Sequence, residues 1–240
     1  CRMIGLFGLA GWMALCQADG WKPAPVPIST RWAAEVKPDK VLPEYPRPQM
    51  VRERWENLNG LWDYAIRPRE EPRPAGWDGK ILVPFAAESS LSGVGKAVDA
   101  NQRLWYRREF TVPPSWQGQR VLLHFGAVDW QCEVFLNGEK VGGHEGGFDS
   151  FSFDLTSKMK GEPGTSQQLA VAVWDPTDKG PQPRGKQVAR PEGIWYTPVT
   201  GIWQTVWMEA VPRSSITSLV LVPDLENSAL KITVRADGER

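Results

Sequence analysis

The sequence predicts an all-β protein, a β-sandwich of the jelly-roll type. From Gly60 onward, short runs of period two in hydrophobicity are interrupted about every 8 to 12 residues by Gly, Pro, Asn or Asp. Few windows have the 3.6-residue period of a helix, so helices should be short. The chain has 23 Gly and 21 Pro for turns, and 13 Trp beside 4 Tyr and 8 Phe. So many large rings indicate a protein that handles a ligand with apolar faces.

The charges of the chain are balanced. Its 240 residues include 28 Lys or Arg and 28 Asp or Glu, with 41% hydrophobic and 23% charged residues. This composition is typical of globular proteins. It argues against a nucleic-acid partner or an anionic membrane surface, because both are bound through excess positive charge.

Residues 1–18 resemble a secretory signal peptide. A basic residue precedes an apolar run at residues 4–15, which is too short to span a bilayer, and Ala18 follows as the expected cleavage site. A buried N-terminal segment and a lipoprotein anchored through Cys16 are the alternatives, although Leu15 is large for the second. We therefore expect a secreted or periplasmic protein without a membrane span. After cleavage only Cys132 would remain, which excludes an internal disulfide, and its strand position predicts a small core residue.

Residues 19–50 carry many prolines and little hydrophobic period, which predicts an extended arm across the domain. Trp21 and Trp32 are candidates for holding this arm in place. Residues 51–212 follow as the sandwich. Strands are expected near residues 61–66, 80–83, 105–112, 120–125, 132–136, 148–153, 169–174 and 204–211.

Two of these strands have specific signals. Asn137 and Gly138 lie between alternating runs and supply the positive φ values of a type I′ hairpin turn. Residues 169–173 are apolar at every position, as in a central strand covered on both faces. Because that strand ends at Trp174 and Asp175, the sheet edge there is a candidate place for a site.

After Pro212, two further alternating strands are expected within residues 213–240. A lone hairpin cannot bury its apolar face. We therefore interpret this segment as the truncated start of a second sandwich, and the chain as a fragment of a longer protein.

Four motifs resemble the N-terminal sugar-binding domain of family 2 glycoside hydrolases, the β-galactosidase, β-glucuronidase and β-mannosidase group. They are WYRREF at residues 105–110, AVDWQCEVFLNG at 127–138, VGGHEGGF at 141–148 with FDLT at 153–156, and GIWYTPVTGIWQTVW at 193–207. The resemblance implies a galactose-binding-like jelly roll, followed by an immunoglobulin-like sandwich whose truncated start is residues 213–240, and then by a barrel that lies in the missing C-terminal part.

The resemblance also implies a retaining mechanism with two glutamates about 5 Å apart at the mouth of the barrel. No residue of this chain can be assigned to either glutamate, so we expect no catalytic residue and no hydrolysis by these 240 residues alone. No cofactor and no metal ligands are expected. The partner is a carbohydrate, a β-glycoside.

The residues expected to contact substrate follow the central strand. By resemblance, a loop acid reaches the sugar here, and Asp178 fits that position better than Asp175. A carboxylate accepts two strong hydrogen bonds from neighbouring hydroxyls. Arg184 lies nearby, and Trp195 is a candidate pocket wall. The alternative is that Asp175 caps a turn and Asp178 is merely solvated.

Other conspicuous side chains are interpreted as structural. His144 lies among glycines and His124 stands alone on a strand, without the convergent ligands that a metal needs, so a structural hydrogen bond is expected for His144. Trp203 and Trp207 share strand parity and are expected to pack. The competing hypothesis for the whole chain is a free-standing carbohydrate-binding or adhesion sandwich without catalysis.

Overall fold

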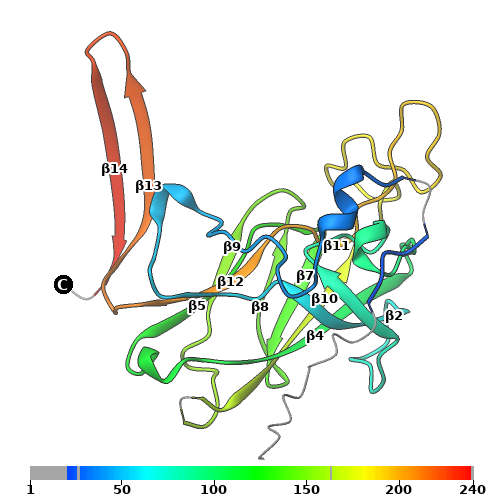
Figure 1. The fold of residues 1–240 in the computed structure, drawn as a ribbon, viewed down its shortest axis with the longest axis horizontal. Helices are drawn as coiled ribbons and strands as arrows, with labels where there is room; N and C mark the ends of the chain where they lie inside the picture. Colours follow the sequence, from blue (N-terminus) through cyan, green and yellow to red (C-terminus); the bar gives the residue numbers. More distant parts are fainter. Residues whose placement is uncertain (1–20, 26–27, 163, 239–240) are drawn as a thin grey trace, which may run out of the picture.

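The protein is a sandwich of two antiparallel β-sheets, seen in a computed structural model that describes residues 21–25, 28–162 and 164–238 (Figure 1). A six-stranded sheet has the order β3-β2-β4-β10-β7-β8, and a four-stranded sheet has the order β1-β12-β5-β9. The expected all-β class and sandwich architecture are confirmed.

The strands have the following bounds. They are β1 Trp55–Asn57, β2 Gly60–Pro68, β3 Gly79–Val83, β4 Gln102–Thr111, β5 Arg120–Phe125, β6 Val128–Asp129, β7 Gln131–Leu136, β8 Glu139–Glu145, β9 Phe151–Asp154, β10 Ser166–Trp174, β11 Gly201–Ile202, β12 Val206–Val211, β13 Ser215–Asp224 and β14 Ala229–Asp237. Short 3₁₀ turns are η1 Arg31–Glu35, η2 Pro48–Met50, η3 Ser90–Ser92 and η4 Pro114–Trp116. All eight expected strands are present, although β9 starts at Phe151 because Phe148 lies in an exposed turn.

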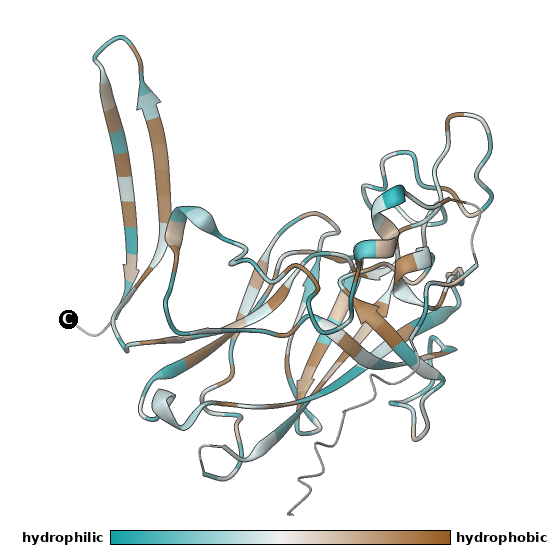
Figure 2. Cartoon of the chain, viewed as in Figure 1, coloured by the Kyte–Doolittle hydropathy of each residue, from teal (hydrophilic) through white to brown (hydrophobic). Residues whose placement is uncertain are grey.

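The core lies between the two sheets, where the apolar sides of their strands meet (Figure 2). The strand β10 is buried from Leu169 to Val173 and pairs with β4 on one side and β7 on the other. Its outer face is covered by a smaller group around Trp105 and Ala172. The expected central strand is therefore confirmed. Cys132 is 1% exposed, as expected for a core residue.

The turn between β7 and β8 is the expected two-residue hairpin. Asn137 and Gly138 have φ of 52° and 86°, and Leu136 pairs with Glu139 across the turn. Both positive values belong to a type I′ turn, whose twist matches that of the flanking strands.

The Pro-rich arm lies across the sandwich with few regular elements. Ala24 exchanges hydrogen bonds with Ser90, and Asn59 reaches the carbonyl of Val41. Trp21 packs its ring close to Gly93, whereas Trp32 is 56% exposed and does not hold the arm. The expectation for Trp32 was wrong because η1 turns its ring outward, where Arg31 covers it.

The hairpin β13–β14 projects away from the sandwich (Figure 1). Its pairs Leu219 with Val234 and Leu221 with Ile232 place large apolar side chains on one face, and most of them are exposed. The two strands expected after Pro212 are therefore present. The division of the chain at residues 19–50, 51–212 and 213–240 stays a prediction, and the expected signal peptide at residues 1–18 lies outside the described residues.

Candidate functional site

A long loop connects the central strand β10 to the short strand β11. The loop of residues 176–199, called here the Asp178 loop, is gold in Figure 1 and extends from the end of the sandwich away from the β13–β14 hairpin. At its far end, Gly201 has φ of +102°, and a Cβ there would lie 1.9 Å from the Tyr106 hydroxyl. That hydroxyl accepts a hydrogen bond from the Ile202 amide. Glycine is required at this point because the core tyrosine approaches the backbone so closely.

Asp175 holds the base of the Asp178 loop from inside the protein. It is 2% exposed, and its Oδ1 accepts the Thr177 amide at 2.8 Å. Its Oδ2 accepts the Thr200 hydroxyl at 3.3 Å, and Gln182, in the middle of the loop, donates to Oδ1 at 3.5 Å. Thr177 has φ of +55°, an unusual value for a β-branched residue. Asp175 therefore ties together the start, the middle and the end of the loop.

Asp178 follows Asp175 by three residues and is half-buried. Its Oδ2 accepts the Ala189 amide at 3.1 Å, which fixes the carboxylate across the loop. Within the described part of the chain, Oδ1 receives no hydrogen bond. The side chain thus combines a fixed position with a free acceptor.

Arg184 and Trp195, the other two residues singled out from the sequence, contact one another. The guanidinium carbon lies 5.6 Å from the Trp195 ring centroid, and Trp195 is 42% exposed. Lys186 stands in the same way over Tyr196, at 5.6 Å. The structure therefore brings Arg184 and Trp195 together at the surface of the loop on which Asp178 lies, while Asp175 is buried at its base.

Two further buried carboxylates support the Asp178 loop. Glu88 is 8% exposed, and its Oε2 accepts the Thr200 amide at 3.0 Å. Asp129 is 3% exposed, and its Oδ2 accepts the Gln187 side-chain amide at 3.1 Å. The carbonyl oxygen of that same amide accepts the Val199 amide at 2.6 Å. Gln187 therefore joins the loop to β6.

Burial changes the protonation of these acids. It raises the pKa of Glu88 to about 7 and that of Asp129 to about 6, in both cases with a smaller contribution from the Asp175 charge. Burial also raises the pKa of Asp175, against the hydrogen bonds from Thr177 and Thr200. Near neutral pH, Glu88 is thus present in both its protonated and its ionised form.

Sequence reasoning did not single out Glu88, Asp129 or Gln187. They are at least 41 residues apart in the sequence, and only folding brings them together. The close approach of Gly147 to Asp129 is visible only in the structure. A Cβ on Gly147 would lie 2.6 Å from its Oδ1, so the glycine-rich segment leaves room for this acid.

The histidines have structural positions. His144 stacks on Phe151 at 4.1 Å, and its Nε2 is buried without a hydrogen-bond partner, so packing takes the place of the expected hydrogen bond. His124 stacks on Trp207, which is 4% exposed. Trp203 is half-buried and donates to the Gly147 carbonyl at 2.8 Å. Among residues 21–238, with 26, 27 and 163 set aside, no group of three His, Cys, Asp or Glu is placed to hold a metal ion.

Comparison with protein families identifies the domain. Residues 79–197, about half of the chain, match the glycosyl hydrolase 2 galactose-binding domain-like family. These residues belong to that family. The matched stretch includes β10 and almost all of the Asp178 loop, so the candidate site lies inside this glycosyl hydrolase 2 domain.

Known relatives of this glycosyl hydrolase 2 domain are glycosidases. The chain is 33% identical over 184 residues to a β-galactosidase of Thermoanaerobacter pseudethanolicus, covering 74% of this chain and 24% of that protein. It is 33% identical over 147 residues to a β-glucuronidase of Felis catus, covering 54% and 22%. The chain spans about a quarter of the length of these curated relatives.

Solved structures show the same fold. A Lactobacillus rhamnosus β-glucuronidase has a TM-score of 0.62 at 21% identity, covering 79% of this chain and 35% of that one. Within the described residues, none of the helical turns is long and apolar enough for a membrane crossing.

Proposed function

We propose that this chain is the carbohydrate-contacting N-terminal domain of a retaining β-glycosidase. The Asp178 loop would form one wall of the sugar pocket, and Asp178 would accept hydrogen bonds from the substrate hydroxyls. The observation that carries the proposal is the free Oδ1 of a carboxylate that the Ala189 amide holds in place. Its support comes from the glycosyl hydrolase 2 family match and from relatives that are β-galactosidases and β-glucuronidases.

The contribution of the chain to the reaction is to bind and orient the sugar. The free Oδ1 of the fixed carboxylate would accept from the substrate through charge-assisted hydrogen bonds, about twice as strong as neutral ones. Asp175 would act as a positioning residue, because it is buried and already hydrogen-bonded within its own loop. The two glutamates of the retaining mechanism would lie in a barrel domain, which an immunoglobulin-like domain would connect to this chain.

The test uses the longer protein obtained by extending the reading frame beyond codon 240. It should hydrolyse a p-nitrophenyl β-D-galactoside, β-D-glucuronide or β-D-mannoside, whereas the 240-residue chain alone should hydrolyse none. Asp178→Asn should lower kcat/KM roughly 10- to 150-fold, from about 1.5 to 3 kcal/mol for one charged hydrogen bond. Lys179→Gln, a change at the adjacent exposed residue, is the control. An unchanged kcat/KM for Asp178→Asn would refute the role of this residue.

The second candidate function is a free-standing carbohydrate-binding module. The exposed rings of Trp195 and Tyr196 favour it, because aromatic faces bind sugars without catalysis. A stop codon directly after residue 240, together with sugar binding by the chain, would support this candidate.

We further propose that the protein is secreted or periplasmic, from the signal-like residues 1–18. Mass spectrometry of the mature protein should find an N-terminus at Asp19. An N-terminus at Cys1 or Met3 would contradict export.

A further inference from the structure

The Asp178 loop carries two cation–aromatic pairs. The Tyr196 amide donates to the Lys186 carbonyl at 2.8 Å, and the Val188 amide donates to the Tyr196 carbonyl at 3.1 Å. This pairing aligns residues 184–188 with residues 194–196 and places Arg184 over Trp195 and Lys186 over Tyr196. The four side chains Arg184, Lys186, Trp195 and Tyr196 are called here the basic–aromatic patch.

The patch is held in place from below. Gln187, directly after Lys186, is only 9% exposed and links Asp129 to the Val199 amide. One guanidinium nitrogen of Arg184 donates to the Gln187 carbonyl at 2.5 Å. The position of the Arg184 guanidinium is therefore set before any ligand binds, which reduces the entropy that a ligand must overcome.

The positive charges of the patch have no counter-charge. In the described part of the chain, Arg184 and Lys186 have no carboxylate oxygen within 4.0 Å, and the ion pairs there use other basic side chains. The loop has two acids: Asp178 is turned to the Ala189 amide, and Glu192 forms no ion pair within the described residues. An anionic group would therefore find two free cations at this surface.

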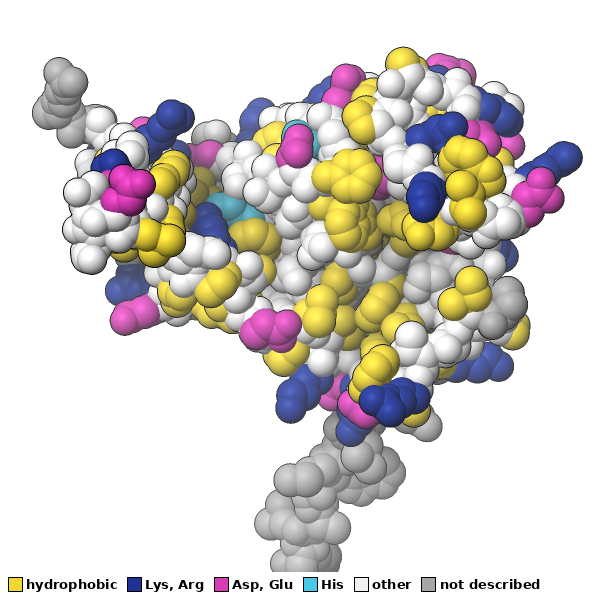
Figure 3. Space-filling view, turned by 90° about the horizontal axis from the view of Figure 1, so that it is seen from above, with side chains coloured by type: hydrophobic (Ala, Val, Ile, Leu, Met, Phe, Trp, Pro, Cys, Tyr) yellow, Lys and Arg dark blue, Asp and Glu magenta, His cyan; other side chains and the backbone are white. Residues whose placement is uncertain are grey.

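The aromatic half of the patch faces water. Trp195 is 42% and Tyr196 is 61% exposed, and apolar side chains do reach the surface beside basic ones in Figure 3. Exposed aromatic faces stack on the C–H faces of sugars, and a guanidinium binds carboxylate or sulfate through two parallel bonds. The two halves together match one chemistry, a sugar ring that carries an anionic group.

We propose that the basic–aromatic patch is a subsite for an acidic sugar unit, one carrying a carboxylate or a sulfate. This inference rests on the proposed function, in which the Asp178 loop contacts carbohydrate. The acidic unit would be a neighbour of the unit that Asp178 holds, because the Asp178 charge repels an anion in its own subsite.

The experiment measures binding to the 240-residue chain by isothermal titration calorimetry with two matched pairs of disaccharides. One pair is cellobiouronic acid and cellobiose, and the other is lactose 3′-sulfate and lactose. In at least one pair, the acidic member should bind about 10-fold tighter than its neutral partner at low salt, as expected for one added charge-assisted interaction. This preference should shrink at 0.5 M salt because exposed charges are screened.

The variant Arg184→Gln/Lys186→Gln should bind the acidic and neutral members equally. Arg190→Gln, at an exposed cation of the same loop, should keep the preference. A preference in only one pair would identify carboxylate or sulfate as the ligand group.

Equal affinity of both members in both pairs, or no detectable binding of either acidic sugar at 10 mM, would overturn the inference. A preference that survives in the double variant, or that Arg190→Gln also removes, would do the same. None of these results affects the proposed function, which is tested by the effect of Asp178→Asn on kcat/KM in the longer protein.

Discussion

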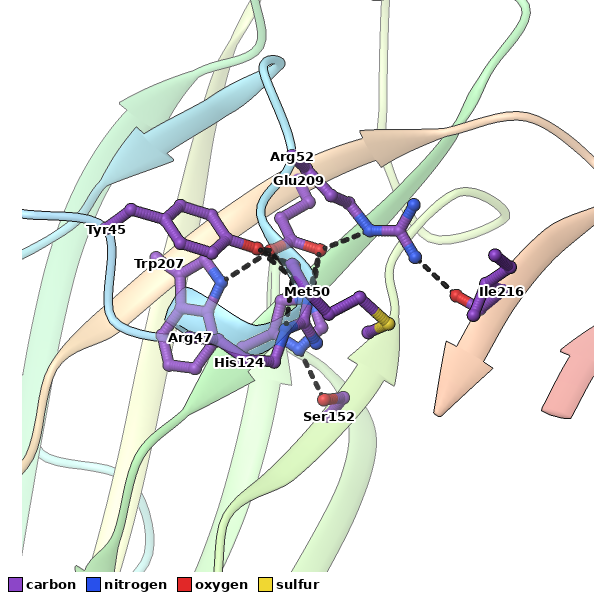
Figure 4. A network of polar contacts seen from close by, with 9 residues as sticks. All are labelled: Tyr45, Arg47, Met50, Arg52, His124, Ser152, Trp207, Glu209 and Ile216. Carbon is purple, nitrogen blue, oxygen red and sulfur yellow. Dashed lines mark hydrogen bonds and ion pairs between the residues drawn. The ribbon is translucent and has the colours of Figure 1, made fainter. Parts of the chain in front are cut away.

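The carboxylate of Glu209 and the carboxylates beneath the Asp178 loop are all buried, yet their pKa values shift in opposite directions. Glu209 on β12 is fully buried among donors from the arm and from two strands (Figure 4). Arg47 donates to both of its oxygens at 2.8 and 2.9 Å, and Arg52 lies 3.0 Å away. Trp207 donates at 2.9 Å, and Tyr45 and His124 complete the group.

Burial would raise the pKa of Glu209, but the hydrogen bonds from His124 and Tyr45, the His124 charge and the Trp207 bond outweigh it. The pKa falls to about 2. Glu88 has a backbone amide and a hydroxyl as its donors, no cation, and a like charge on Asp175, so its pKa rises to about 7. The comparison teaches that the partners of a buried acid, and not its burial alone, decide its charge.

The largest expected effect on stability is that of a substitution at Glu209. Glu209→Gln removes the charge that Arg47 and Arg52 share and should lower the free energy of unfolding by about 3 to 5 kcal/mol, the usual cost of breaking a buried ion pair. Urea denaturation at pH 7 measures this loss. Glu56→Gln, at an exposed position on the neighbouring strand β1, should change it little. A loss under 1 kcal/mol for Glu209→Gln would show that the pair contributes little.

The contributions of Glu209 and Glu88 to the free energy of unfolding should depend on pH with opposite signs. The pKa of Glu209 is lowered from 4.5, so its contribution is present above pH 4.5 and is lost as pH falls toward 2. The pKa of Glu88 is raised from 4.5, so the folded state binds its proton more tightly. Its unfavourable ionisation therefore lowers stability as pH rises from 4.5 to 7.

Glu88→Gln should therefore stabilise the protein at pH 8, by about 1 to 3 kcal/mol, and have little effect at pH 5. The glutamine keeps an acceptor for the Thr200 amide but cannot ionise. Thermal unfolding at the two pH values measures the difference. An equal effect at both values would mean that Glu88 has an ordinary pKa in the folded protein.

Asp129→Asn should behave in the same way over a lower pH range, because the pKa of Asp129 rises from 3.8 to about 6. The stabilisation should be complete by pH 7 and amount to about 1 to 3 kcal/mol, because a pKa rise of this size represents at most about 3 kcal/mol. Loss of the Gln187 contact is checked by comparing Asp129→Asn with Gln187→Ala at the same pH. A destabilised Asp129→Asn at pH 8 would show that the charge is needed for that contact.

The smallest effect on stability is expected at Asp178. Asp178→Asn keeps an oxygen for the Ala189 amide, and the side chain is half-buried, so the free energy of unfolding should change by less than about 0.5 kcal/mol. Asp175→Ala, which leaves the Thr177 amide and the Thr200 hydroxyl without their acceptor, should cost about 1 to 3 kcal/mol. Equal losses for both variants would contradict the division into a contact residue and a positioning residue.

Much of the fold could be predicted because its signals are local. The type I′ turn at Asn137 and Gly138 follows from two residues that tolerate positive φ. The central strand at residues 169–173 follows from apolar side chains on both faces. Short strands such as β6 and β11 could not be predicted, because each is two residues long and exists only by pairing with the other.

The candidate site, like the fold, has some features that the sequence predicts and others that only the tertiary structure sets. The sequence alone determined that Asp175, Asp178, Arg184 and Trp195 lie in one loop after a buried strand, since chain order keeps neighbours together. Only the tertiary structure decided that Asp175 is buried, that Glu88 and Asp129 lie beneath the loop, and that Arg184 covers Trp195. Hydrophobic burial brings these distant segments together, and it leaves no pattern in the sequence that says which acids will meet.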